Sequence, residues 1–122
     1  MKTTKDDFEY FKRKCDLWIE VFGLMSWNIT YKHERLQSEW LASCNANYSG
    51  RNATLALSTH WKYIKTSEKE LNKSAFHEVM ELLLSPLYGQ ARSRVWDEEE
   101  FERAIHEITR TFENVMLKKE EI

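Results

Sequence analysis

Residues 67–84 read SEKELNKSAFHEVMELLL, and this segment has the features of a long helix that is covered on most sides. Ser67 and Glu70 match a capping box, in which a Ser/Thr and a Glu three positions later satisfy N–H groups at a helix start. The apolar residues recur at helical spacing: Leu71, Ala75, Val79, Leu82 and Leu83. Pro86 and Gly89 predict the end of this helix shortly after residue 84.

The residues that precede this helix predict a helix and then strands. Residues 4–22 carry apolar side chains at spacings of three and four, as in an amphipathic helix. Trp27, Ile29 and Tyr31 then alternate with polar residues, which is typical of a half-buried strand. Two further strands are expected at 40–46 and 53–59. The short turn between them favours an antiparallel hairpin.

A last helix is predicted over residues 97–116, after a short linker at 88–96. Its acidic start suits the positive end of the helix dipole. Its predicted core stripe consists of Phe101, Ile105, Ile108, Phe112 and Val115. The sequence therefore predicts one α+β domain spanning residues 1–122, with an N-terminal helix, a three-stranded mainly antiparallel sheet, a site helix and a C-terminal helix.

Composition restricts the class of protein. Hydrophobic residues make up 42% of the chain, enough for a packed core, and the formal net charge of −2 argues against a general nucleic-acid binder. No apolar run approaches the roughly 20 residues of a membrane span. The first residues lack an apolar signal region, so we expect a cytoplasmic protein, in the host cytoplasm if phage-encoded. Cys15 and Cys44 are then expected to be free thiols, and the sequons at Asn28, Asn47 and Asn52 to be unused.

The predicted site helix carries a group of residues suited to metal chemistry. His77 and Glu81 lie four residues apart, so both side chains fall on one helix face and could hold a divalent metal. Glu78 is rotated by about 100° from His77, a position that suits a general base acting on metal-bound water. The His-Glu dipeptide occurs three times in the chain, so the dipeptide alone is not diagnostic. Residue 77 stands out because polar groups in an apolar helix are costly unless a metal or a partner compensates them.

A third ligand is expected from the last helix. Glu99, Glu102 and His106 form a stripe there, which could face His77 if the two helices pack antiparallel. His106 is the better match by chemistry because imidazole suits zinc, and Glu102 is the next candidate. Spacing alone leaves both open.

Residues 75–87, AFHEVMELLLSPL, resemble a family of small phage- and prophage-encoded zinc metallopeptidases. These are minimal zincins, whose site helix carries His-Glu-x-x-His followed by Leu-Leu and often by Pro-Leu. The resemblance implies a zinc cofactor, His77 as a zinc ligand and Glu78 as the catalytic base. The second histidine of the motif is replaced here by Glu81. This departure changes the charge and length of the ligand, although a carboxylate is an ordinary zinc ligand.

Two functions follow from these residues. In the first, the protein is a zinc-dependent peptidase: Glu78 takes a proton from metal-activated water, and a polypeptide substrate lies along the 53–59 strand. In the second, the same fold has lost its chemistry and binds a host protein without catalysis. Neither function involves nucleic acid or a membrane.

Overall fold

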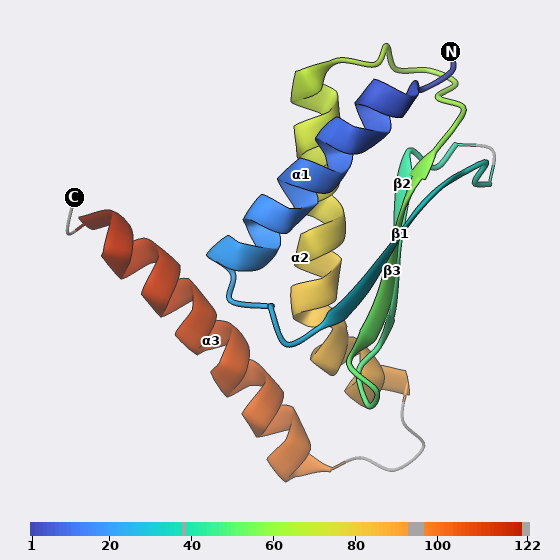
Figure 1. Ribbon diagram of the computed structural model, residues 1–122. Helices are drawn as coiled ribbons and strands as arrows, with labels where there is room; N and C mark the ends of the chain where they lie inside the picture. The colour runs from blue at the N-terminus through green and yellow to red at the C-terminus, as the bar shows by residue number, and fades with distance from the viewer. Residues whose placement is uncertain (38, 93–96, 121–122) are drawn as a thin grey trace.

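The computed structural model describes residues 1–37, 39–92 and 97–120 and has the α+β arrangement that the sequence predicts (Figure 1). In chain order, the elements are α1 (Lys5–Val21), β1 (Asn28–Glu34), β2 (Ala42–Asn47), β3 (Asn52–Ser58), α2 (Glu68–Arg92) and α3 (Glu98–Glu120). No helix in this described part of the chain is long and apolar enough to cross a membrane.

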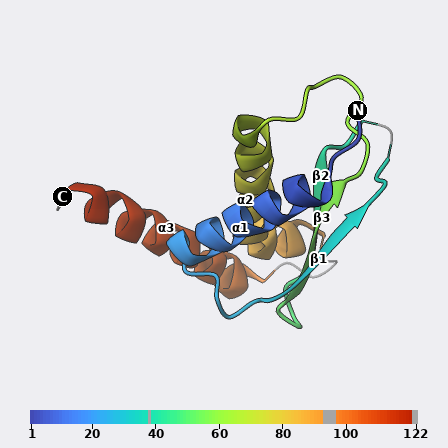
Figure 2. The ribbon, with the colours of Figure 1, turned by 45° about the horizontal axis from the view of Figure 1, so that its top comes forward.

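The sheet is mixed and has the order β1-β3-β2, so that β3 is its central strand. β2 and β3 form the expected antiparallel hairpin, with Cys44 opposite Leu55. β1 runs parallel to β3, from Asn28 opposite Asn52 to Glu34 opposite Ser58. α1 and α2 lie together on one side of the sheet (Figures 1 and 2).

The main core lies between the sheet and these two helices. Seven side chains of this core, among the described residues, are completely buried and come from α1, β3, the segment after β3, and α2: Phe11, Cys15, Leu55, Leu57, Trp61, Ala75 and Val79. The indole Nε1 of Trp61 also donates a 3.1 Å hydrogen bond to the carbonyl oxygen of Leu41. A tryptophan is buried at little polar cost when its N–H has such a partner.

Capping residues fix where α1 ends and α2 begins. Gly23 follows α1 with a φ of +69°, a left-handed conformation that glycine adopts without a Cβ clash. The N–H of Leu24 then donates back to the carbonyl of Ile19 at 2.8 Å, which closes the end of the helix. At the start of α2, the Glu70 N–H donates to Ser67 Oγ at 3.2 Å, as the capping signal predicts.

The predicted end of the site helix is wrong, because α2 continues through Pro86 and Gly89 to Arg92. Proline cannot donate the N–H that would normally bond to the carbonyl four residues earlier, which here belongs to Leu82. Ser85 Oγ donates to that carbonyl instead, at 2.7 Å. The carbonyl oxygen of Leu82 therefore keeps a hydrogen-bond partner in the buried interior, and the helix continues beyond Pro86. The predicted 88–96 linker is accordingly helical as far as residue 92, and its residues 93–96 lie outside the described residues.

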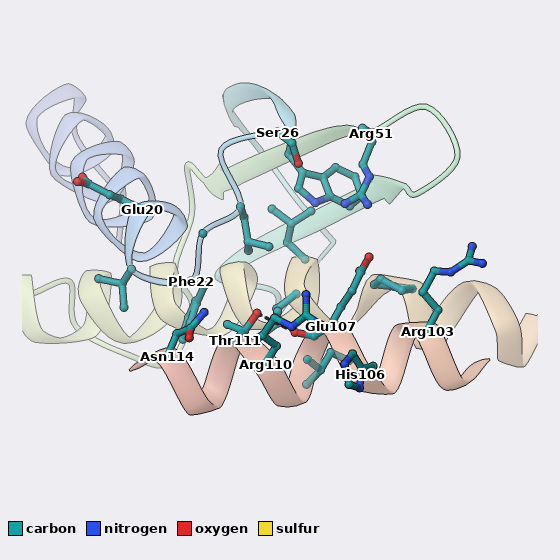
Figure 3. A pocket seen from close by; sticks show the side chains of 18 of the residues that line it. Glu20, Phe22, Ser26, Arg51, Arg103, His106, Glu107, Arg110, Thr111 and Asn114 are labelled. Atoms are coloured by element: carbon teal, nitrogen blue, oxygen red, sulfur yellow. Dashed lines mark hydrogen bonds between the residues drawn. The ribbon is translucent and has the colours of Figure 1, made fainter. Parts of the chain in front are cut away.

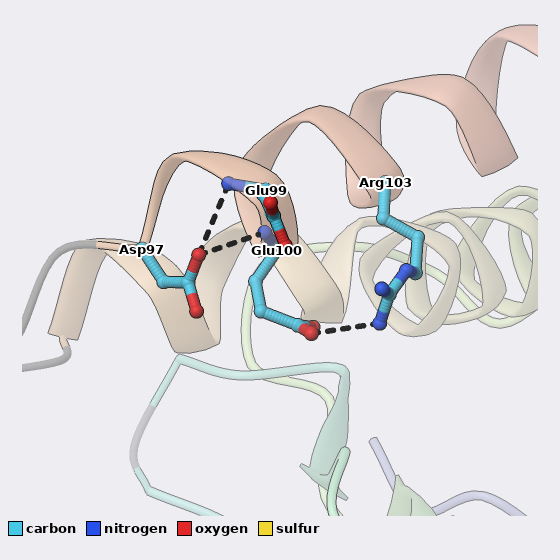
Figure 4. A network of polar contacts seen from close by, with 4 residues as sticks. All are labelled: Asp97, Glu99, Glu100 and Arg103. Carbon is cyan, nitrogen blue, oxygen red and sulfur yellow. Dashed lines mark hydrogen bonds and ion pairs between the residues drawn. The ribbon is translucent and has the colours of Figure 1, made fainter.

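α3 begins at an Asp97 cap, where the carboxylate accepts from the N–H groups of Glu99 at 3.0 Å and Glu100 at 3.3 Å (Figure 4). The predicted core stripe of this helix is only partly buried. Ile108 and Val115 pack against the main core, whereas Ile105 and Phe112 are about 40% exposed. The reason is that α3 packs mainly against α2 and diverges from the rest of the fold toward its C-terminus (Figures 1 and 2).

Candidate functional site

The structure brings together three of the residues that the sequence singles out. His77, Glu78 and Glu81 each offer a metal-ligating atom, and these atoms all lie within 4.8 Å of one another. His77 Nε2 is 3.6 Å from Glu81 Oε1, and both side chains are largely exposed, at 68% and 53%. Their helical spacing of four residues therefore places an imidazole and a carboxylate side by side at the surface of α2.

Glu78 differs from these two residues because it points inward and is only 5% exposed. Burial is the main reason why its pKa rises from 4.5 to about 8. A hydrogen bond to Glu81 and the negative charge of Glu81 raise the pKa further. Glu78 therefore holds a proton at neutral pH and donates it in a hydrogen bond to Glu81.

Both cysteines belong to the surroundings of this carboxyl group. Cys44 of β2 and Cys15 of α1 are buried or half-buried, and burial followed by neighbouring negative charge, including that of Glu78, raises the pKa of each thiol. For Cys44 the pKa reaches about 12. Linear spacing could not reveal this neighbourhood. The hairpin register could have done so, because Cys44 lies opposite the buried Leu55 and hence on the helix-covered face of the sheet.

His106 and Glu102, the expected third ligands, are not part of this group among the described residues. Both line a separate cavity of about 910 Å³ between α3 and the α1–β1 connection. In this cavity Arg51 and Ser26 lie on one side, and His106 and other α3 residues lie on the other (Figure 3). α3 approaches α2 through the side that carries Leu83 and Pro86, whereas His77 lies on the opposite side of that helix. The expectation that α3 completes the site is therefore not met in this structure.

The strand expected to bind a substrate must also be corrected. β3, which covers most of residues 53–59, pairs with a strand on each side, so it has no free edge to offer to a peptide. β2 is an edge strand, and it packs against α2, which carries the candidate site. The unpaired backbone groups of β2 are therefore the ones available for strand addition near His77 and Glu81.

His77 and Glu81 fit two of the four coordination positions of a tetrahedral zinc ion. Two ligand atoms that each lie 2.0–2.1 Å from zinc in tetrahedral geometry are about 3.4 Å apart. The 3.6 Å between His77 Nε2 and Glu81 Oε1 is close to this separation. Glu78 has a ligand atom within 4.8 Å of these two and could accept a proton or provide a third ligand.

Comparisons of the chain with family models, with curated proteins and with solved structures find no match. The resemblance to the phage zinc metallopeptidases therefore rests on residues 75–87 and stays a prediction.

Proposed function

We propose that this protein is a metal-dependent peptidase whose site is built on α2. The observation that carries the proposal is the His77–Glu81 pair, with its ligand atoms 3.6 Å apart beside a buried carboxyl group. His77 and Glu81 would hold a divalent cation, and zinc matches this pair of donors. When bound, zinc supplies Lewis acidity and makes a water molecule more acidic.

Glu78 is the residue that accepts and returns the proton. Its carboxyl group lies within 4.8 Å of the two ligand residues, and its pKa near 8 places its protonation change close to neutral pH. A bound cation would lower that pKa and free the carboxylate to accept a proton as a general base. Burial keeps the carboxylate poorly solvated, which makes it a stronger base than an exposed glutamate. An extended polypeptide that binds as an additional strand at the free edge of β2 would pass the same part of α2.

Metal content tests this proposal directly. The full chain, dialysed against zinc and then against metal-free buffer, is expected to retain one zinc ion by mass spectrometry. His77→Ala should lose the ion, whereas His106→Ala should keep it because His106 lies in the separate cavity. Glu78→Gln should keep zinc and lose hydrolysis of an unfolded protein such as casein. Absence of bound zinc from the unmodified chain would refute the proposal.

The second candidate is a non-catalytic module that binds a host protein. It is favoured by one observation, namely that no residue of α3 joins His77, Glu78 and Glu81 among the described residues. Two or three ligands from a single helix bind a metal more weakly than a closed four-ligand site. This candidate predicts no retained zinc and an unchanged fold in His77→Ala, so the same experiment separates the two functions.

A further inference from the structure

α3 presents a narrow apolar stripe to solvent. Ile105, Phe112 and Met116 are exposed at 41%, 40% and 59%. At 100° per residue, these three side chains fall within about 40° of the helix circumference. Thr109 extends the stripe to about 60° and carries no charge. The stripe is therefore a continuous seam along roughly three turns rather than a set of scattered apolar residues.

The rest of the described chain leaves this seam open. α3 makes its principal contacts with α2 alone. Its buried Ala104 and its partly buried Ile108 and Val115 lie beside the seam. Both ribbon views show the C-terminal end of α3 extending beyond α1 and α2 (Figures 1 and 2). The seam residues Ile105, Thr109, Phe112 and Met116 follow one another at spacings of four, three and four, the alternation that characterises helices packing along a seam.

We infer that this seam binds the α3 helix of a second copy of the same chain, in antiparallel orientation. The charge distribution decides the orientation. Residues 97–107 contain six acidic residues and one arginine, whereas residues 108–117 contain one acidic and one basic residue. Parallel pairing would place the two acid-rich halves together, and antiparallel pairing places each acid-rich half against a half whose charges balance.

The order of the seam residues also suits a two-fold pair. When two helices run antiparallel, Ile105 of one copy meets Met116 of the other, and Thr109 meets Phe112. The Thr109–Phe112 layer then combines a small and a large side chain, and the Ile105–Met116 layer combines two of similar volume. The same surface serves on both copies, as a two-fold interface requires. A seam of roughly three helical turns buries less surface than the roughly 800 Å² per partner of a stable interface. Association is therefore expected to be weak, with a dissociation constant on the order of 50 μM.

Sedimentation of the full chain across about 5 to 500 μM brackets this dissociation constant. The mass should rise from 14.7 kDa toward twice that value. Met116→Glu should weaken association by roughly tenfold or more, because it places a carboxylate in the apolar seam. Met25→Glu is the matched control, since Met25 is a 65% exposed methionine that does not belong to α3. Circular dichroism checks that both variants remain folded. A chain that is monomeric throughout, or equal effects of the two substitutions, would overturn the inference.

Cysteine crosslinking tests the orientation. In the antiparallel pair, the two copies of residue 109 lie close to the two-fold axis, so Thr109→Cys should form a disulfide-linked dimer under mild oxidation. The two copies of residue 116 would be about 16 Å apart along the axis, so Met116→Cys should not crosslink. Crosslinking of both variants would indicate a parallel pair and would contradict the proposal. The unmodified chain, whose thiols are buried or half-buried, is the control.

Discussion

The buried carboxyl group of Glu78 should make the stability of this protein depend on pH. Its folded pKa of about 8 lies above the ordinary value of 4.5, so the folded state binds a proton that the unfolded state has released between these two pH values. The stabilisation that the protonated Glu78 gives to the folded state is therefore fully present below about pH 4.5 and is lost as pH rises through about 8. Each pH unit in that window is worth 1.36 kcal/mol, which gives a loss of roughly 3 to 5 kcal/mol.

Glu78→Gln isolates this effect, because glutamine has nearly the same shape, stays neutral at every pH and can still donate to Glu81. We expect the variant to match the unmodified protein near pH 5 and to exceed it by roughly 3 kcal/mol near pH 8.5. Urea unfolding in the presence of a chelator, followed by tryptophan fluorescence, gives both free energies. Glu113→Gln, at an exposed position on α3, is the control and should keep the pH dependence of the unmodified protein. Equal pH dependence in Glu78→Gln and the unmodified protein would refute the reasoning.

Two further predictions concern the interior of the site helix and its neighbours. Ser85→Ala should destabilise the protein by about 1 to 3 kcal/mol, because it leaves the buried Leu82 carbonyl without a donor. Ser85→Ala should be nearly neutral in a Pro86→Ala background, where residue 86 regains its N–H. Urea unfolding of the unmodified protein, the two single variants and the double variant measures the free-energy cost of Ser85→Ala in each background. Equal costs in the two backgrounds would contradict the prediction. Cys44, with a pKa of about 12, should react with a thiol reagent at pH 8 about a thousandfold more slowly in the folded than in the unfolded chain. Comparable rates in the two states would contradict this prediction.

Local signals in the sequence were sufficient to predict most of the fold. The shift from a helical period to alternation at Trp27 marks the first strand, and the short turn after residue 46 marks the hairpin. Ser67 identifies the start of α2 because its hydroxyl accepts a hydrogen bond from the first-turn N–H of Glu70. These features depend on residues that are close in sequence, which is why a periodic pattern reveals them.

Features that depend on distant residues could not be predicted. Pro86 suggests a helix end, and only the position of Ser85 beside the freed carbonyl explains why α2 continues. β1 pairs with β3 rather than with its neighbour in sequence, which places β3 at the centre and removes its free edge. The face of α3 that meets α2 is likewise set by packing, so the sequence could not decide whether His106 reaches His77.

The candidate site also combines features set by residues close in sequence with features set by distant residues. His77, Glu78 and Glu81 were predicted together because a helix fixes side chains four residues apart on one face, whatever surrounds it. The inward orientation of Glu78 and its proximity to Cys44 required the packing of β2 against α2. Residue spacing therefore predicts which groups meet, and packing determines their protonation.

Glu81 has an electrostatic consequence that distinguishes this site from one with a histidine in its place. A neutral imidazole would leave only burial to raise the pKa of Glu78, whereas Glu81 adds a hydrogen bond and a negative charge to the effect of burial. A divalent cation held by His77 and Glu81 would offset that charge and lower the pKa of Glu78, so metal binding would release the proton of Glu78. The same replacement that departs from the family motif thus couples the protonation of the proposed base to occupancy of the proposed metal site. The pH dependence of stability should consequently be steeper with a chelator than with zinc.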